Sequence, residues 1–271
     1  MGLYANTVTT TWANLKTTLA ALTANTSVII SDPNNVKFAP TTSSPSTGTS
    51  FGDIIYSATP STVLVDFSDN DFSANTNVTN TPITTAVPFA GWFSYEGEGI
   101  SDACRISGMG KLPTITTSLF FAFYGTNLQK IDLSNLSNVV NASFAFYGTK
   151  VTSIDISSMV SLTTAQAMLV SSTVATVNME GCTELKEVAA MLSNCTSLAK
   201  VYMFNNTFNL SSEPTSTNYF MDSVPTSCVF YVTPSSYSTW YSRLYTNYAN
   251  WGLSAAHTPT TANLIVYHRV A

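Results

Sequence analysis

Hydrophobic residues recur at a nearly constant interval through the middle of the chain. Units begin at Leu128, Val151, Val174 and Leu198, so successive units are 23, 23 and 24 residues apart. Within a unit, further apolar residues follow three, five, eight and eleven positions after the first. The later columns are Ile131, Ile154, Val177 and Val201; Leu133, Ile156, Met179 and Met203; Leu136, Met159 and Cys182, with Asn206 in the fourth unit; and Val139, Leu162 and Leu185.

This spacing follows the leucine-rich-repeat pattern L-x-x-L-x-L, at a period within the range typical of such repeats. The alternation inside the motif predicts a short strand with one face turned inward. A single unit cannot bury its own apolar face, so neighbouring units must stack and share a core. The sequence therefore predicts an α/β leucine-rich-repeat solenoid of about five to seven coils, with short parallel strands and helical caps at both ends.

Each unit also carries a second, Ala-rich apolar cluster, at 142–147, 165–170 and 188–193. These clusters predict a short helix or turn that closes the far side of the coil. Two of the turns end in "YGT", where Gly125 and Gly148 are expected to have a positive φ. Ser171 and Cys195 are assigned the matching places in later units, so this turn does not strictly require glycine.

The chain divides into three predicted regions. An N-terminal cap and loop, with a docking role, covers 1–60; the solenoid covers 61–225; a strand-helix-strand cap covers 226–271. The solenoid begins with looser units at 61–72 and 104–127, the latter with Ile106 on its strand, and has an irregular insertion at about 73–101. Residues 34–50 read as a polar loop.

Both caps have amphipathic segments. At the N-terminus, a helix precedes a strand at 27–31; at the C-terminus, a strand from Cys228 precedes a helix with Ser235 or Ser236 as its N-cap, and a last strand covers 264–270. The apolar faces of the two helices are Trp12, Leu15, Leu19 and Leu22, and Tyr237, Trp240, Tyr241, Leu244 and Tyr248.

Several of these segments resemble the BspA-like leucine-rich-repeat family of bacterial surface proteins. The similarity lies in "LQKIDLSNLSNVVNASFAFYGTK" (128–150), in the "CTSL" unit at 195–198, and in the closing strand and Tyr/Trp-bearing helix at 228–251. It covers roughly 103–251, with few repeats and low charge for this family. Relatives of these repeats also occur in phage structural proteins. The resemblance implies adhesion or ligand binding without catalysis.

Composition narrows the range of partners. Only 9% of the residues are charged and the net charge is −5, without any cluster of Lys and Arg, so neither nucleic acid nor an anionic membrane surface is an expected partner. No apolar run is long enough to span a membrane. The four cysteines, Cys104, Cys182, Cys195 and Cys228, lack metal-binding spacing and are expected to be buried thiols, with a disulfide left open.

Motifs that would carry chemistry are absent from the sequence, and we expect neither enzymatic activity nor a cofactor. The two histidines, His257 and His268, have no second ligand at metal spacing, and no phosphate-binding loop or nucleophile elbow is present. Asp69 and Asp71 form a weak calcium-loop candidate without the glycine and glutamate of an EF-hand. A carbohydrate-active enzyme remains a third hypothesis; it would need two carboxylates facing each other across a cleft.

The repeat itself predicts an ordered polar array on the strand face. Residues at one outward strand position in successive units should form a ladder, because neighbouring strands lie about 4.8 Å apart. Asp66 is a further candidate for this ladder. The ladder is Asp132, Asp155, Asn178 and Tyr202, and the polar face around it includes Gln129, Thr152, Thr176 and Lys200, with Lys130 and Ser153. This face is either the ligand surface or simply solvated.

These observations predict a non-enzymatic structural and binding protein. The N-terminal residues "MGLYANTVTTTWANLK" have no secretory-signal pattern, which favours a virion protein of phage fibre or decoration type. Its expected partners are other virion proteins and a host glycan or protein, and a homo-oligomer is left open. The alternative is a secreted bacterial leucine-rich-repeat adhesin at the cell surface.

Overall fold

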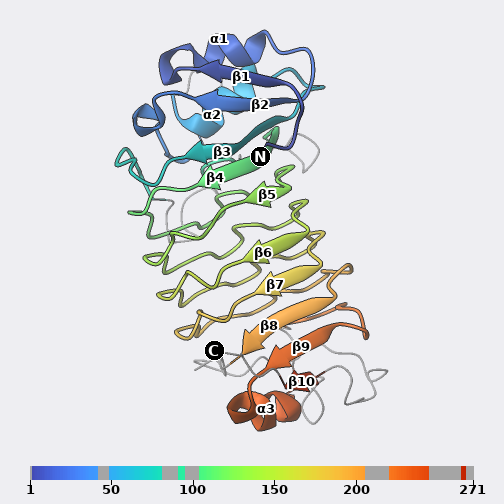
Figure 1. Cartoon of the computed structure of the whole chain (residues 1–271). Helices are drawn as coiled ribbons and strands as arrows, with labels where there is room; N and C mark the ends of the chain where they lie inside the picture. The colour runs from blue at the N-terminus through green and yellow to red at the C-terminus, as the bar shows by residue number, and fades with distance from the viewer. Residues whose placement is uncertain are drawn as a thin grey trace.

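The computed structural model describes residues 2–41, 49–80, 91–94, 104–204, 220–243 and 264–266. In this part, the chain forms a mixed α/β structure with two parallel sheets and few helices, and neither sheet closes into a barrel. The strands lie one after another along the long axis of an elongated molecule, with α1 and α2 at the N-terminal end and α3 at the other (Figure 1).

Each sheet has five strands. The first has the order β1-β2-β3-β4-β5 and the second the order β10-β9-β8-β7-β6, and all neighbouring strands in the two sheets are parallel. The strands are β1 (Thr7–Thr10), β2 (Thr26–Ile30), β3 (Val65–Asp71), β4 (Ile106–Lys111), β5 (Lys130–Ile131), β6 (Ser153–Asp155), β7 (Thr176–Asn178), β8 (Lys200–Phe204), β9 (Val229–Val232) and β10 (Leu264–Val266).

The register of the second sheet confirms the predicted alignment of the units. Ile154 of β6 pairs with Val177 of β7, which pairs with Val201 of β8, so residues 23 and 24 positions apart lie directly opposite each other. Two neighbouring parallel strands must be joined by a long crossover connection. Here each crossover is the remainder of one repeat unit. The predicted strands at 61–72 and in 104–127 are also present, as β3 and β4.

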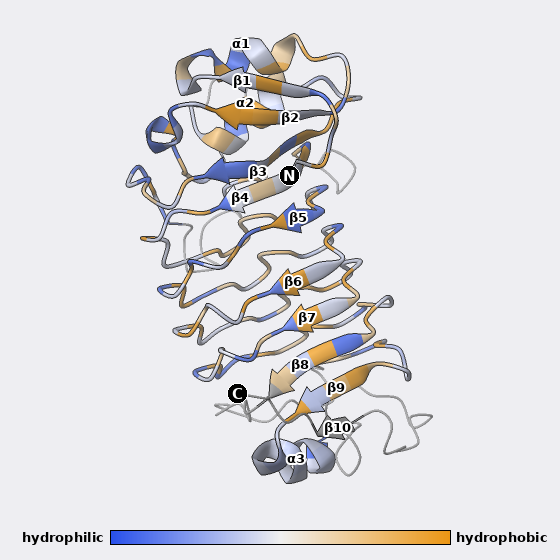
Figure 2. Ribbon diagram, viewed as in Figure 1, coloured by the Kyte–Doolittle hydropathy of each residue, from blue (hydrophilic) through white to orange (hydrophobic). Residues whose placement is uncertain are grey.

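The predicted hydrophobic columns form the interior. Every member in the described residues is at most 2% exposed, except Ile131, which is partly buried against the core. Figure 2 shows hydrophobic and hydrophilic residues side by side along β6 to β8, as expected for strands with one face inside. Shared burial between neighbours is therefore the main stabilising interaction along the stack.

The far side of each unit is a turn and not a helix. Backbone N–H groups alternate between two acceptors: Phe121 and Phe123 donate to Ser143 and Ala145 in the next unit, whereas Ala122 donates to Leu119 within its own unit. The same alternation recurs in the next two units. Because half of these donors are directed to the next unit, the turns form a second hydrogen-bonded ladder that runs behind the strands.

Two residues in each of these turns have left-handed backbone conformation. Gly125 and Gly148 have φ of 67° and 69°, as predicted, and Ser171 has the same conformation without glycine. The assignment of Cys195 to this place was wrong: the left-handed residue is Asn194, because the turn repeats at 23 residues here. Sequence analysis did not foresee the other left-handed column, Phe121, Phe144, Ala167 and Ala190.

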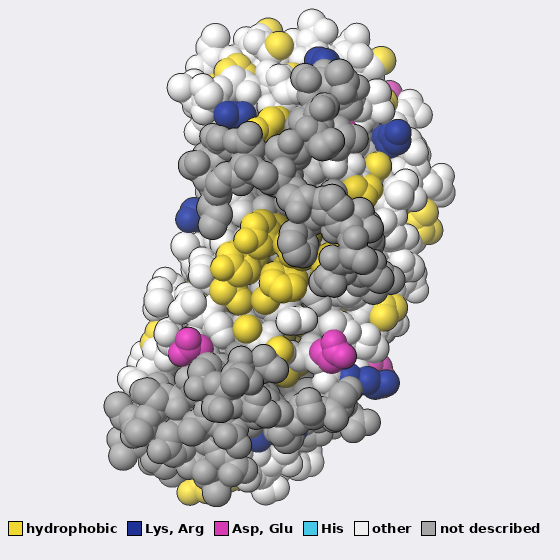
Figure 3. All heavy atoms as spheres, turned by 180° about the vertical axis from the view of Figure 1, so that it is seen from behind, with side chains coloured by type: hydrophobic (Ala, Val, Ile, Leu, Met, Phe, Trp, Pro, Cys, Tyr) yellow, Lys and Arg dark blue, Asp and Glu magenta, His cyan; other side chains and the backbone are white. Residues whose placement is uncertain are grey.

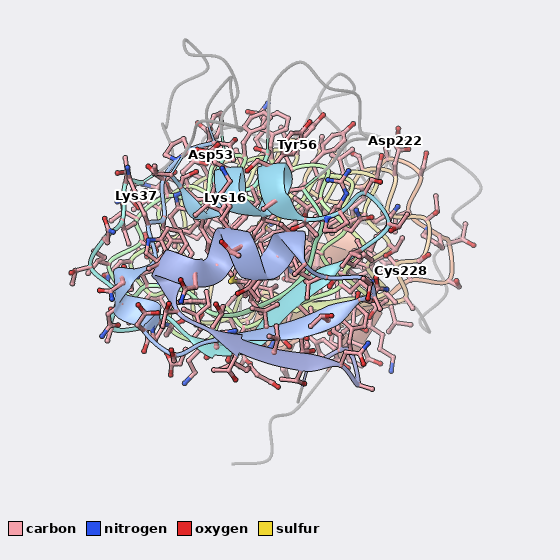
Figure 4. The ribbon with its side chains drawn as sticks, turned by 90° about the horizontal axis from the view of Figure 1, so that it is seen from above. Lys16, Lys37, Asp53, Tyr56, Asp222 and Cys228 are labelled. Carbon is pink, nitrogen blue, oxygen red and sulfur yellow. The ribbon has the colours of Figure 1, made fainter. Side chains whose placement is uncertain are left out.

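The N-terminal end is covered by two short helices. The predicted helix exists as η1 (Trp12–Asn14) followed by α1 (Leu15–Ala20), and its strand is β2. A second helix, α2 (Phe51–Ala58), begins at the capping hydroxyl of Ser50, which accepts a hydrogen bond from the N–H of Asp53. Viewed along the axis, α1 and α2 lie side by side across the end, with Asp53 and Tyr56 on α2 (Figure 4). A short η2 (Pro33–Asn35) overlaps the start of the predicted polar loop at 34–50.

The C-terminal end follows the predicted strand and helix, as β9 and α3 (Pro234–Tyr241). The predicted N-cap was wrong. Helix α3 starts with Pro234 at its first position, which fits there because it lacks the N–H that a helix start leaves unpaired. The N-cap is therefore Thr233, and Ser236 is buried inside the helix with its hydroxyl donating to the Thr233 carbonyl. The predicted face residues Leu244 and Tyr248 lie outside the described residues.

Candidate functional site

The second sheet brings together six of the ten predicted strand-face residues. Asp155, Asn178 and Tyr202 pair in one row across β6, β7 and β8. Thr176 pairs with Lys200 in the next outward row, to which Ser153 also belongs. Lys200, Asp155 and Ser153 are exposed and the other three members of this surface are partly exposed. These rows form a continuous polar surface, which we call the strand face.

The remaining candidates lie apart from these paired rows. Asp132 and Gln129 flank β5, which belongs to the first sheet and has no strand pairing with β6. Thr152 directly precedes β6, is exposed, and its carbonyl accepts hydrogen bonds from the N–H groups of Ala175 and Thr176. The sequence predicted a ladder of four residues with a polar face around it; the structure pairs three of the four, and Ser153, Thr176 and Lys200 form the neighbouring row.

The Asp and Asn residues of the predicted ladder help to end the strands. The Oδ1 atoms of Asp132 and Asp155 accept hydrogen bonds from the N–H groups of Ser134 and Ser157, both at 2.9 Å. Asn178 makes the equivalent bond to Glu180. An Asp or Asn side chain that binds the backbone two residues later forms an Asx turn, which competes with strand continuation. The repetition of Asp and Asn in this column is thus explained by the turn alone.

The fourth member of the column breaks this rule. Tyr202 stacks on Tyr231 of β9, with ring centroids 4.6 Å apart and an interplanar angle of 13°. Both rings are partly exposed. Sequence analysis missed Tyr231, because it lies 29 residues after Tyr202 and so falls outside the 23-residue interval. The strand face therefore changes along its length from Asp155 and Asn178 to an aromatic pair.

The weak calcium candidate, Asp69 and Asp71, lies on β3. Asp71 accepts hydrogen bonds from the hydroxyl and N–H of Ser73, and these lower its pKa. The described residues include no group of three or more His, Cys, Asp or Glu side chains that could hold a metal ion. His257 and His268 lie outside the described residues.

Asp66 does not belong to the exposed ladder. It is 1% exposed, and its carboxylate accepts hydrogen bonds from the hydroxyl of Ser27 and the N–H groups of Leu3 and Ser68. Gly108 makes room for it: a Cβ there would lie 1.9 Å from Asp66 Oδ1. This carboxylate fixes the N-terminal segment to β2 and β3.

The four cysteines are free and buried, as predicted. Burial raises the pKa of Cys104 and Cys182 to about 12 and that of Cys195 to about 11. The thiols of Cys182 and Cys195 each approach a carbonyl oxygen of the preceding unit, Ile156 and Leu169, at 3.2 and 3.1 Å. These thiols therefore pack as small core residues, and each makes a weak hydrogen bond to the preceding unit.

On the side opposite the strands, aromatic rings of two successive units stack on each other. Phe121 stacks on Phe144 and Tyr124 stacks on Tyr147, both with centroids 4.7 Å apart and interplanar angles of 19° and 24°. Tyr124, Phe144 and Tyr147 are partly exposed. We call these four residues the ring stack. The space-filling view shows a hydrophobic patch near the middle of this face (Figure 3).

The ring stack is built on strained backbone. Phe121 and Phe144 have φ of 56° and 58°, a conformation that costs roughly 1–2 kcal/mol for a residue with a Cβ. Ala167 and Ala190 occupy the same turn position, so the turn does not require a ring. The positive φ is therefore a property of the turn in each unit, and the two rings are an addition to it. Partial burial next to Tyr147 raises the pKa of Tyr124, which keeps its hydroxyl neutral.

The two ends of the ring stack differ. At the N-terminal end, residues 91–94 pack against the backbone of the first unit, with Ser94 Oγ donating to the carbonyl of Phe121 at 2.7 Å. Gly91 allows this contact, since a Cβ there would lie 1.8 Å from the same oxygen. At the other end, the columns continue as Ala167 and Val170, so Phe144 and Tyr147 are the last rings.

No family model matches the chain, and no curated protein or solved structure is significantly similar to it. Among the described residues, no helix combines the length and hydrophobicity needed to cross a membrane.

Proposed function

We propose that the chain is a leucine-rich-repeat-type solenoid that acts as a non-enzymatic structural and binding protein at a particle surface. The observation that carries this proposal is the parallel register of β6, β7 and β8, in which equivalent residues of successive units lie opposite each other. Such a stack buries its apolar columns between neighbours and leaves the outward rows free for recognition.

The strand face is the proposed contact surface. It combines hydroxyl, amide and ammonium groups with the Tyr202–Tyr231 pair. Partly exposed tyrosines supply contact area at low entropic cost, and they are enriched where proteins bind each other. The partner is a host glycan or protein, and other virion proteins contact the chain at its ends.

A virion protein of fibre or decoration type is the preferred carrier of this function. The low charge supports it, as does the resemblance of the repeats to the BspA-like family, relatives of which occur in phage structural proteins. The alternative, a secreted bacterial surface adhesin, is supported by the strand and helix of β9 and α3, which follow the ending of the BspA-like proteins.

Immunogold electron microscopy of the source culture tests the location. Antibody against the chain should label virus particles under the first proposal and cell envelopes under the second, and label confined to the cytosol would refute both.

A matched pair of lysines tests the contact surface. Lys200→Glu changes the strand face, whereas Lys186→Glu changes an exposed lysine outside the strands. We expect adhesion of purified chain to immobilised host cells to fall by at least about fivefold for the first variant and to stay constant for the second. Equal adhesion of both variants would remove the strand face from the proposal.

A further inference from the structure

We propose that the open end of the ring stack is a second binding site, which takes a pyranose ring of a neutral glycan. The inference deepens the binding role proposed above and rests on it, but it assigns the contact to a different face of the molecule. Four observations carry it: the orientation of the rings, the small residues beyond them, the polar side chains at their sides, and the charge.

The rings are stacked along the long axis, so a flat face is available where the stack ends. Phe121 and Tyr124 have their neighbours Phe144 and Tyr147 on one side, at 4.7 Å. No described ring stacks on the opposite faces of Phe144 and Tyr147, where the next unit provides Ala167 and Val170. A planar group one unit further along would continue the stack at the same spacing.

Where the rings end, the smaller side chains of the next unit lower the surface and form a step. Ala167 and Val170 form the floor of this step. They are 6% and 7% exposed, as expected for small side chains beside larger ones. Ala and Val replace Phe and Tyr in the same columns, so the next unit supplies no ring, and neighbouring units are separated by about 4.8 Å. A sugar ring placed over this unit would therefore lie at stacking distance from Phe144.

Hydrogen-bonding groups border the step. Gln166 and Ser171 occupy the positions directly next to Ala167 and Val170 and both are exposed, as is Asn194 in the following unit. An apolar surface of ring faces with amide and hydroxyl groups at its border matches the two kinds of surface that a pyranose presents, its C–H face and its equatorial hydroxyls.

Charge and size select a neutral glycan. The chain carries a net charge of −5, and the face in Figure 3 bears acidic side chains toward the C-terminal end from the hydrophobic patch, with Lys or Arg side chains beside them and at the edges of the view. Sialylated or sulfated glycans would be repelled. A protein partner would need roughly 800 Å² of complementary surface on this face, whereas the apolar part is confined to one short stack of rings with polar neighbours.

An array of neutral hexasaccharides of glucose, galactose, mannose or N-acetylglucosamine, printed beside sialylated glycans, tests the site with the full chain. At least one neutral hexasaccharide should bind. Tyr147→Leu and Phe144→Leu should weaken this binding by at least about tenfold, and Tyr147→Phe should preserve it. Tyr241→Leu removes an exposed ring from α3, outside both proposed surfaces, and should change the affinity by less than about twofold.

The outcomes separate this site from the strand face. Loss of glycan binding in Tyr202→Leu with full binding in Tyr147→Leu would overturn the inference and leave the proposed function intact. Binding of sialylated glycans alone, absence of any neutral ligand, or capture of only a protein on this face would also overturn it. Gln166→Ala, a change of an exposed side chain, provides a variant that does not disturb the rings and should weaken binding by about threefold.

Discussion

The stacked interior makes a sharp quantitative prediction at Leu162. This residue is 0% exposed and lies in the apolar column between Val139 and Leu185 of the neighbouring units. Leu162→Ala removes three buried carbon atoms, which corresponds to about 2.4 kcal/mol of transfer free energy at about 0.8 kcal/mol each. The cavity that remains adds to this, so we expect a loss of about 3 kcal/mol in the free energy of unfolding.

The control is two residues away. Val160, in the same unit, is 49% exposed, so Val160→Ala should change the free energy of unfolding by less than about 0.5 kcal/mol. Both variants are compared by urea denaturation, followed by far-ultraviolet circular dichroism. A loss under about 1 kcal/mol for Leu162→Ala, or equal losses for the two variants, would refute the shared interior.

Three further predictions concern single side chains. Gly108→Ala should lower the free energy of unfolding by about 1–3 kcal/mol, because the new methyl group would displace the Asp66 carboxylate; an unchanged urea midpoint would contradict this. Asp155→Ala should cost about 1 kcal/mol through loss of its Asx turn, whereas Asp155→Asn, which retains the acceptor, should be neutral in thermal unfolding. The pKa of Cys104 is raised to about 12 in the folded chain, so its contribution to the free energy of unfolding should be fully present below about pH 9 and decline as the pH rises to about 12. Cys104→Ala should weaken this decline in urea titrations, and an identical pH dependence in the two proteins would refute it.

The repeat was readable from the sequence because burial depends on spacing. Leu128, Ile154 and Met179 could be assigned to interior columns since each unit places its apolar residues at the same intervals. Strand positions followed from the same register, as the pairing of Ile154 with Val177 shows. The helix α2 was missed because its eight residues are too short for a periodic signal and follow a Pro/Ser/Thr-rich stretch.

Backbone conformation was much less accessible than burial. Gly125 and Gly148 pointed to positive φ, but nothing in the composition of Phe121 or Phe144 indicates a left-handed residue. Hydrophobic periodicity assigns such aromatic residues to the core, so the ring stack was not separable from the interior by sequence alone. Asp66 was assigned to the exposed column because its spacing resembled that of the column. It is buried, and its carboxylate accepts hydrogen bonds from the hydroxyl of Ser27 and the N–H of Leu3.

A repeating structure helps to separate residues that maintain the stack from residues that do something else. A feature that recurs from unit to unit is needed to maintain the stack. The Asp or Asn side chain that ends a strand is such a feature, at Asp132, Asp155 and Asn178, although this column was the first candidate for ligand binding. What only some units carry cannot be required by the turn or the strand. The Tyr202–Tyr231 pair and the ring stack meet this second criterion, and each is partly exposed. Recognition is therefore to be sought where the repeat departs from its own pattern. The positive φ of Phe144 is shared with Ala167 and Ala190 and belongs to the turn, whereas the ring on it does not.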